Sequence, residues 1–221
     1  MFRQKCKKIL NRNNKGTTLV EMLVCFMMLA IFLTAAFSVI THLSTLYYQI
    51  KGETYGKQVS DILMLKIQSE IEGAKTRNDD LLIDGSKTNT SGSTMVFYDR
   101  TDTKVELSTV DRYFQIKYYA FENEEDSGKS RNENIWKYDK NVYNSFYVES
   151  ITYIKASDLS SASNKTLAES YGLTVGDNEY GDDVILVLLN LKSHHYGEYK
   201  SYRFIRMYNY QDSPSGGESN P

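Results

Sequence analysis

A long uncharged and mostly apolar run lies near the amino terminus. From Met22 to Thr41 the sequence contains no charged residue. At ~1.5 Å per residue, a helix of about 20 residues crosses the ~30 Å hydrocarbon layer of a membrane. The run therefore predicts a membrane-spanning helix, whose characteristic residues include Met22, Leu23, Val24, Leu29, Ile31, Phe32, Leu33 and Thr41.

A second helical pattern follows this run. Apolar residues recur at steps of three to four with polar residues between them, which predicts an amphipathic continuation of the helix to about Ala74. They are Leu43, Tyr47, Ile50, Val59, Leu63, Ile67 and Ile71. Gly52 and Gly56 fall in a longer gap, and each weakens a helix by about 1 kcal/mol relative to alanine. Either a bend or a tolerated glycine pair is expected there.

The rest of the chain has the pattern of a β-rich head. Residues 75–94 are mostly small and polar, with a short Leu81-Leu82-Ile83 interruption, and predict a connecting loop. After it, β-branched and aromatic residues alternate with polar ones in segments that predict antiparallel strands. These segments are Met95–Asp99, Lys104–Val110, Tyr113–Glu122, Ile135–Lys140, Phe146–Ala156, Asp183–Lys192 and Glu198–Tyr210. Val184–Leu189 is apolar on both faces and predicts the central buried strand.

The predicted fold class is α+β, with the long helix packed on an antiparallel β-sheet head. The expected organisation is a leader at 1–16, a membrane-spanning helix at 17–41 and its amphipathic continuation at 42–74. The loop at 75–94, the head at 95–210 and a disordered polar tail at 211–221 follow. Cys6 and Cys25 both precede the head, so the head must fold without a disulfide.

Charge is distributed unevenly along the chain. Six cations and no acids precede Gly16: Arg3, Lys5, Lys7, Lys8, Arg12 and Lys15. Of the 26 cations and 28 acids in the whole chain, 20 cations and 28 acids therefore follow Gly16, a net charge of −8. By the positive-inside rule the amino terminus stays cytoplasmic and the head is exported. An acidic body does not favour nucleic-acid binding.

Glu21 is unusual because it lies at the edge of the apolar run. A carboxylate at the centre of a bilayer costs roughly 2.5–3.5 kcal/mol on insertion scales, and less toward the interface. A partner for this charge is therefore expected.

The segment Lys15-Gly16-Thr17-Thr18-Leu19-Val20-Glu21-Met22-Leu23 resembles the class III leader of type IV pilins and type II secretion pseudopilins. The resemblance implies that prepilin peptidase cleaves between Gly16 and Thr17 and methylates the new amino terminus at Thr17. It also implies a pilin-like fold and assembly with other pilin subunits on an inner-membrane platform. The chain departs from the family at Thr17, where an aromatic residue is usual, and at Ser38, where a proline is frequent.

Cleavage would create the missing counter-charge for Glu21. A free α-amino group has a pKa of about 7.7–8.0 and is largely cationic at neutral pH. It could pair with Glu21 of a neighbouring subunit or, four residues along one helix, within the same subunit. Both pairings stay open. Two alternatives to cleavage at Gly16 are a signal peptide cut at Thr34-Ala35-Ala36 and an uncleaved signal anchor in which Glu21 reaches the interface.

These features predict a structural subunit of a type IV pilus, a competence pseudopilus or a type II secretion-like filament. The size of the head favours a minor pilin or pseudopilin. The alternative is a membrane-anchored extracellular binding module that does not polymerise. No nucleophile and oriented base can be identified together, so neither an enzyme nor a cofactor is expected.

Five weaker candidate features lie in the head. Asp177, Glu179, Asp182 and Asp183 could bind Ca²⁺, although a solvated acidic turn is the favoured interpretation. His194 and His195 are expected on opposite faces of a strand, where they could not share a metal.

A basic and aromatic stripe could bind single-stranded DNA, but cross-strand charge on a solvated sheet face is the commoner explanation. It comprises Lys192, His194, Tyr199, Lys200, Tyr202, Arg203, Phe204 and Arg206. For the acidic run at Glu122–Asp126, the sequence offers no oriented base, nucleophile or apolar pocket, so no catalytic role is predicted. The aromatic group Trp136, Tyr138, Tyr143, Phe146 and Tyr147 is expected in the core, with a binding surface as the alternative.

Overall fold

The computed structural model describes residues 18–75, 81–84, 92–119, 133–175 and 181–209. The chain divides into two compact units, Met1–Tyr47 and Tyr48–Pro221. The predicted leader and the predicted polar tail lie outside the described residues. The boundaries proposed for these two segments remain predictions.

Helix α1 (Leu19–Glu72) is a single continuous helix of 54 residues. No proline occurs before Pro214, so no residue along its length lacks a backbone donor. The helix passes Ser38, Gly52 and Gly56 without interruption and ends two residues before the predicted limit at Ala74. In the first unit, the described residues consist almost entirely of this helix.

The second part of α1 supplies one side of the head core. Val59, Leu63, Ile67 and Ile71 are fully buried, as their spacing predicts. Leu43, Tyr47 and Ile50 continue the same sequence pattern but are exposed. The buried face of α1 begins at Gly52 and includes Gly56 and Ser60. Small residues therefore continue the buried face between Ile50 and Val59, where the apolar spacing is interrupted.

Both glycines are needed for close packing of α1 against the head. A Cβ atom added to Gly52 would lie 2.9 Å from Tyr196 Cβ. One added to Gly56 would lie 2.6 Å from Tyr199 Cγ. The missing side chains let the helix approach these residues closely, which outweighs the lower helix propensity of glycine.

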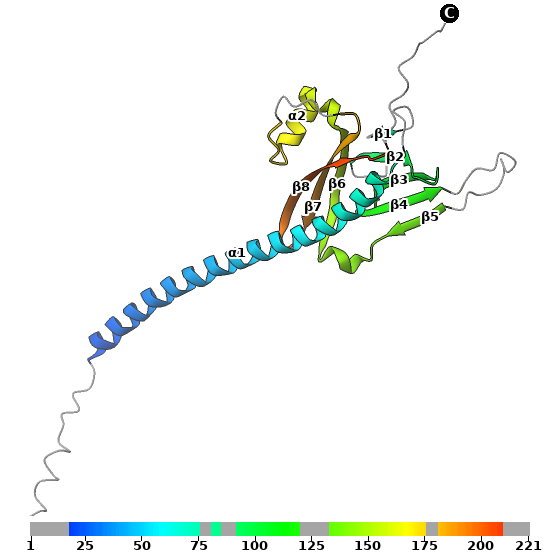
Figure 1. Ribbon diagram of the computed structural model, residues 1–221. Coiled ribbons are helices and arrows are strands. Elements are labelled where there is room, and N and C mark those ends of the chain that lie inside the picture. The colour runs from blue at the N-terminus through cyan, green and yellow to red at the C-terminus, as the bar shows by residue number, and fades with distance from the viewer. Residues whose placement is uncertain (1–17, 76–80, 85–91, 120–132, 176–180, 210–221) are drawn as a thin grey trace, which may run out of the picture. The chain divides into compact units, whose positions relative to one another are not determined.

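Five antiparallel strands form the first sheet, in the order β1-β2-β3-β4-β5 (Figure 1). Their bounds are β1 (Leu82–Asp84), β2 (Thr94–Tyr98), β3 (Lys104–Val110), β4 (Tyr113–Tyr119) and β5 (Glu133–Lys137). The meander was predicted, with β3 at its observed limits. Strand β1 corrects the prediction, because Leu82–Asp84 pairs with β2 instead of lying in a loop. Three residues are too few to show an alternating pattern.

Three antiparallel strands form the second sheet, in the order β6-β7-β8. They are β6 (Phe146–Lys155), β7 (Val184–Ser193) and β8 (Gly197–Arg206). Strand β7 is central, which confirms the position expected for Val184–Leu189. Ile185, Val187 and Leu189 join the core beneath α1, whereas Leu186 and Leu188 belong to a second apolar cluster. Both faces are therefore buried, which explains the continuous apolar run.

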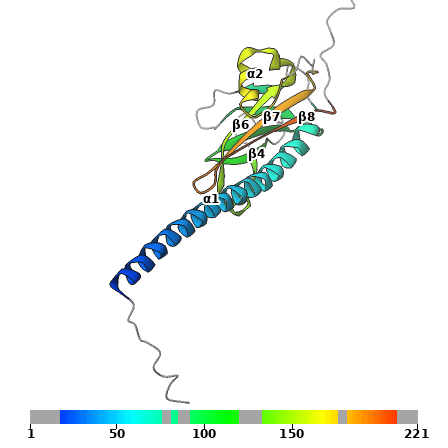
Figure 2. The same ribbon diagram turned by 90° about the vertical axis from the view of Figure 1, so that its left-hand side faces the viewer.

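The second cluster is covered by a segment that sequence patterns did not identify. It contains the 3-10 helix η2 (Ala156–Ser160) and helix α2 (Ala162–Glu169), where Leu159 and Ala168 are buried (Figure 2). Ser161 caps α2 by accepting a hydrogen bond from Asn164 N at 3.4 Å. Eight residues are too short for a clear helical period, so α2 was missed.

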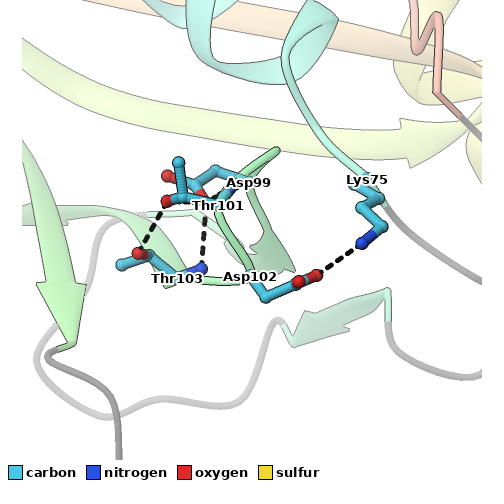
Figure 3. Close-up of polar contacts among 5 residues, drawn as sticks. All are labelled: Lys75, Asp99, Thr101, Asp102 and Thr103. Atoms are coloured by element: carbon cyan, nitrogen blue, oxygen red, sulfur yellow. Dashed lines mark hydrogen bonds and ion pairs between the residues drawn. The ribbon is translucent and has the colours of Figure 1, made fainter.

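The turn between β2 and β3 is tied to the chain that leaves α1 (Figure 3). Asp99 Oδ1 accepts hydrogen bonds from Thr101 N at 2.8 Å and Thr103 N at 2.9 Å. Lys75 Nζ donates to Asp102 Oδ1 at 2.8 Å, and Lys75 N donates to Tyr98 O at 2.7 Å. These bonds direct the chain from the end of the helix toward the first sheet.

Candidate functional site

Thr18 and Glu21 form a reciprocal pair at the start of α1. Thr18 N donates to Glu21 Oε2 at 2.8 Å, and Glu21 N donates to Thr18 Oγ1 at 3.3 Å. This is a capping box, which satisfies two backbone donors that a helix terminus otherwise leaves unpaired. A charge partner was expected for Glu21, but this capping role was not. The Thr-x-x-Glu spacing was the available signal for this second role.

The proposed cleavage and methylation residues, Gly16 and Thr17, lie outside the described residues. Thr18 is the first residue whose position is described, directly after them. Cleavage after Gly16 and methylation of Thr17 therefore stay predictions.

The apolar stretch of α1 leaves its large side chains exposed. Ile31 and Phe32 are each 71% exposed, and Met22, Leu23, Val24, Leu29 and Leu33 are exposed as well. Among the described residues, α1 is the one helix long and apolar enough to cross a membrane. Helices that expose apolar side chains on all sides are found in membranes or covered by partners.

Two threonines within this stretch have satisfied hydroxyl groups. Thr34 Oγ1 donates to Ala30 O at 2.7 Å, and Thr41 Oγ1 donates to Phe37 O at 2.8 Å. These bonds run back one helical turn and satisfy the hydroxyl donors of both threonines. The two threonines are therefore compatible with a membrane-spanning helix.

Polar contacts fix the second part of α1 to both sheets of the head. Ser60 and Ser201 share a hydrogen bond of 2.6 Å, and Arg203 Nη1 donates to Gln68 Oε1 at 2.8 Å. On the first sheet, Tyr118 Oη donates to Glu70 Oε1 at 3.0 Å. Burial and then the Glu70 carboxylate raise the pKa of Tyr118. These pairs set the register of the helix along the head, and sequence spacing gave no signal for them.

The acidic turn is described only in part. Asp177 and Glu179 lie outside the described residues, and Asp182 is exposed. Asp183 Oδ2 pairs with Arg206 Nε at 2.8 Å, and Asp183 O accepts a bond from Met207 N at 2.8 Å. Asp183 therefore joins the two ends of the β7-β8 hairpin. No cluster of three metal-binding side chains occurs in the described part of the chain.

His194 and His195 were wrongly placed on a strand. They lie in the turn between β7 and β8, and their rings contact different aromatic side chains. His194 lies 5.6 Å from the ring of Tyr147, and His195 lies 6.3 Å from that of Tyr196. Their separate contacts give no support to a shared ligand.

The basic and aromatic stripe is divided between the two faces of β8. Tyr199 and Arg203 face α1, as their contacts with Gly56 and Gln68 show. Lys200 and Arg206 lie on the other face, near Glu198 at 3.8 Å and Asp183 at 2.8 Å. Lys192 lies 3.8 Å from Glu149. Charge pairs between segments account for Lys192 and Arg206, a pair along β8 accounts for Lys200, and Arg203 binds Gln68 of α1. This geometry gives no support to a nucleic-acid groove. The acidic run at 122–126 lies outside the described residues.

The aromatic group is mostly a core feature. Tyr143 and Phe146 are buried, whereas Trp136, Tyr138 and Tyr147 are half-buried. Phe114 N donates to Tyr143 Oη at 3.1 Å, and burial raises the pKa of Tyr143 to about 12. Tyr153 is also buried, but no hydrogen-bond partner for its hydroxyl is found among the described residues. The two tyrosines therefore have opposite hydrogen-bonding states.

The amino-terminal region matches a known sequence family. Residues 11–37 fit the prokaryotic N-terminal methylation motif. Comparisons with curated proteins and with solved structures give no match. The motif implies processing by prepilin peptidase and assembly with other pilin subunits. The chain therefore carries the prepilin-type methylation motif together with a long helix packed on antiparallel sheets, consistent with the type IV pilin and pseudopilin family.

Proposed function

We propose that the protein is a minor pilin or pseudopilin that enters a filament through its amino-terminal helix. Prepilin peptidase cleaves after Gly16 and methylates Thr17. The subunit then waits in the membrane with its amino terminus on the cytoplasmic side and its head outside. A type IV pilus, a competence pseudopilus or a type II secretion-like filament is the expected assembly.

The observation that carries the proposal is the position of the methylation motif on α1. The motif covers residues 11–37, and within it the helix exposes apolar side chains. From Gly52 onward the same helix belongs to the core of the head. One part is thus available to lipid or to neighbouring helices, and the other holds the folded domain.

Glu21 has a specific role in this proposal. After cleavage, the amino group of Thr17 in a neighbouring subunit supplies a cation for its carboxylate. An unpaired charge among apolar helices is costly, so subunits are favoured in the register that pairs the two groups.

N-terminal mass spectrometry of the membrane fraction tests the processing step. The expected mature chain begins at Thr17 and carries one additional methyl group on its amino nitrogen. An intact Met1, or a start at Phe37, would contradict the proposal. An uncleaved chain that remains monomeric would instead indicate a membrane-anchored binding module.

A further inference from the structure

Aromatic and cationic side chains gather at the end of the head where α1 enters it. We define the collar as Lys51, Tyr55, Arg112, Tyr147, His194 and Tyr196. It is built by α1, by the turn between β3 and β4, by the start of β6 and by the turn between β7 and β8. Figure 2 shows the β7-β8 turn beside α1, where Gly52 approaches Tyr196.

Ring contacts connect the members of the collar. Lys51 Nζ lies 5.5 Å from the ring centre of Tyr55, which lies 5.8 Å from that of Tyr196. Arg112 Cζ lies 4.7 Å from the ring centre of Tyr147, which lies 5.6 Å from that of His194.

The β7-β8 turn joins the two groups, because it holds both Tyr196 and His194, and Phe146 of β6 stacks on Tyr196 with ring centres 5.9 Å apart. Val148 N donates to Arg112 O at 2.9 Å, which joins the β3-β4 turn to β6. Beside the collar, Lys140 Nζ lies 5.6 Å from the ring centre of Tyr113. The four segments therefore form one connected surface.

The collar differs in charge from the rest of the body. Its segments at 51–55, 111–113, 139–149 and 192–197 contain four cations and four acids. The whole excess of 28 acids over 20 cations beyond Gly16 therefore lies elsewhere. A surface of this kind approaches phosphate groups with less repulsion than the acidic remainder.

The length of the uncharged segment matches the thickness of a bilayer with its headgroups. No Asp, Glu, Lys or Arg occurs between Met22 and Ile50. At ~1.5 Å per residue these residues extend about 43 Å, close to the ~40–45 Å thickness of a bilayer with its headgroups. Lys51 follows immediately. Tyrosines with lysines or arginines are the residues enriched in this interfacial layer.

We propose that the collar rests on the phospholipid headgroup layer while the subunit is anchored in the membrane before assembly. Lipid phosphates pair with Lys51, Arg112 and Lys140, and the tyrosine rings lie at headgroup depth. Contact with the surface restricts the tilt of the head and so presents α1 to the assembly machinery in one orientation. The inference rests on the membrane anchoring proposed above and concerns the subunit before polymerisation.

Spin labels on the full-length chain in phospholipid vesicles test this contact. In a Cys6→Ser, Cys25→Ser background, one label is attached at Asn141→Cys beside the collar and another at Ser163→Cys on α2. Both positions are exposed. We expect collisions of the first label with a water-soluble paramagnetic agent to fall several-fold on reconstitution, while those of the second stay unchanged. The double variant Arg112→Glu, Lys140→Glu should restore collisions at residue 141.

The control reverses two exposed cations outside the collar, Lys137→Glu with Lys165→Glu, and should leave the protection intact. Flotation with the vesicles separates the two ideas. A chain that does not float contradicts the membrane anchoring itself. A chain that floats but leaves both labels equally open to water overturns the collar contact alone. Protection that appears only at high protein-to-lipid ratio would assign the surface to a second copy and also overturn it.

Discussion

The Glu21 carboxylate lies 2.8 Å from the backbone nitrogen of Thr18, and the Thr18 hydroxyl lies 3.3 Å from the backbone nitrogen of Glu21. The residue proposed to pair with a neighbouring subunit is therefore already held by the first turn of its own helix. This hydrogen bond fixes the position of the carboxylate, but it does not neutralise the negative charge. Capping geometry and charge can consequently be separated by substitution.

Glu21→Gln should abolish incorporation into filaments while leaving the protein at normal levels in the membrane. The glutamine side chain can still accept the bond from Thr18 N, but it cannot neutralise a neighbour's amino group. Sheared filament fractions and whole-membrane immunoblots measure the two quantities.

Thr18→Ala is the matched control, because it removes the hydroxyl partner and keeps the charge. Loss of one cap costs about 1 kcal/mol in helix stability, so filaments should form at reduced or equal yield. If Glu21→Gln assembled as well as the unchanged chain, the proposed charge pair would have no role.

Gly56→Ala should destabilise the head although alanine favours helices. The added Cβ would lie 2.6 Å from Tyr199 Cγ, close to the strand backbone, where little movement is possible. Overpacking costs roughly 1–3 kcal/mol against a gain in helix propensity of about 1 kcal/mol. We expect a net loss of up to about 2 kcal/mol by these values. Urea unfolding in detergent, followed by the fluorescence of Trp136, measures it.

Gly73→Ala provides the comparison at the end of α1. There an added Cβ would have ordinary contacts of 3.5 Å with Glu70 O and Ser69 O. The Gly73→Ala variant should therefore be nearly as stable as the unchanged chain. Equal effects of the two substitutions would show that close packing is not why residue 56 is a glycine.

Tyr143→Phe and Tyr153→Phe should have different effects, although both remove one buried hydroxyl. The Tyr143 hydroxyl accepts a bond from Phe114 N, so its removal leaves a buried donor unpaired, at a cost of about 1–3 kcal/mol. The Tyr153 hydroxyl has no such bond in the described structure, and its removal should be neutral or stabilising. Midpoints of thermal unfolding rank the two variants, and a larger loss for Tyr153→Phe would contradict this assignment.

Alkaline pH should unfold the head. Burial raises the pKa of Tyr143 to about 12, whereas the unfolded chain releases this proton near 10. The unfolded state therefore binds fewer protons above pH 10, and stability falls between about pH 10 and 12. A difference of about two pKa units corresponds to roughly 3 kcal/mol, fully present below pH 10.

Burial also raises the pKa values of Tyr118 and Tyr153, which act in the same direction. Unfolding free energies measured at pH 8 and pH 11 check the sign. The Tyr143→Phe variant should lose less stability over this interval than the unchanged chain. Stability that stays constant to pH 11 would contradict the burial of these hydroxyls.

Repeating patterns in the sequence predicted most of the backbone. The periodicity of Val59, Leu63, Ile67 and Ile71 indicated the face of α1 that packs against the head, and all four are buried. Alternation predicted β3 at Lys104–Val110, and a continuous apolar run predicted the central position of β7. Helix α2 and strand β1 were missed because eight and three residues give too little pattern to detect.

Long-range contacts gave no comparable signal. Gly52 and Gly56 looked like weak points of the helix until Tyr196 and Tyr199, about 140 residues later, were seen against them. The tight turn that holds His194 and His195 was likewise hidden, because a hairpin turn and a strand end can have similar compositions.

By itself, the sequence determined the features that depend on neighbouring residues: the apolar span, the isolated Glu21 beside it, the methylation motif and the long helix. Helical and strand periods arise from residues close together in the chain, so a short stretch of sequence is enough to detect them. Only the tertiary structure decided which face of α1 needs glycine, which tyrosine hydroxyl is bonded and how four separate segments make the collar. These depend on contacts between residues far apart in the chain, and such contacts leave no period in a single sequence.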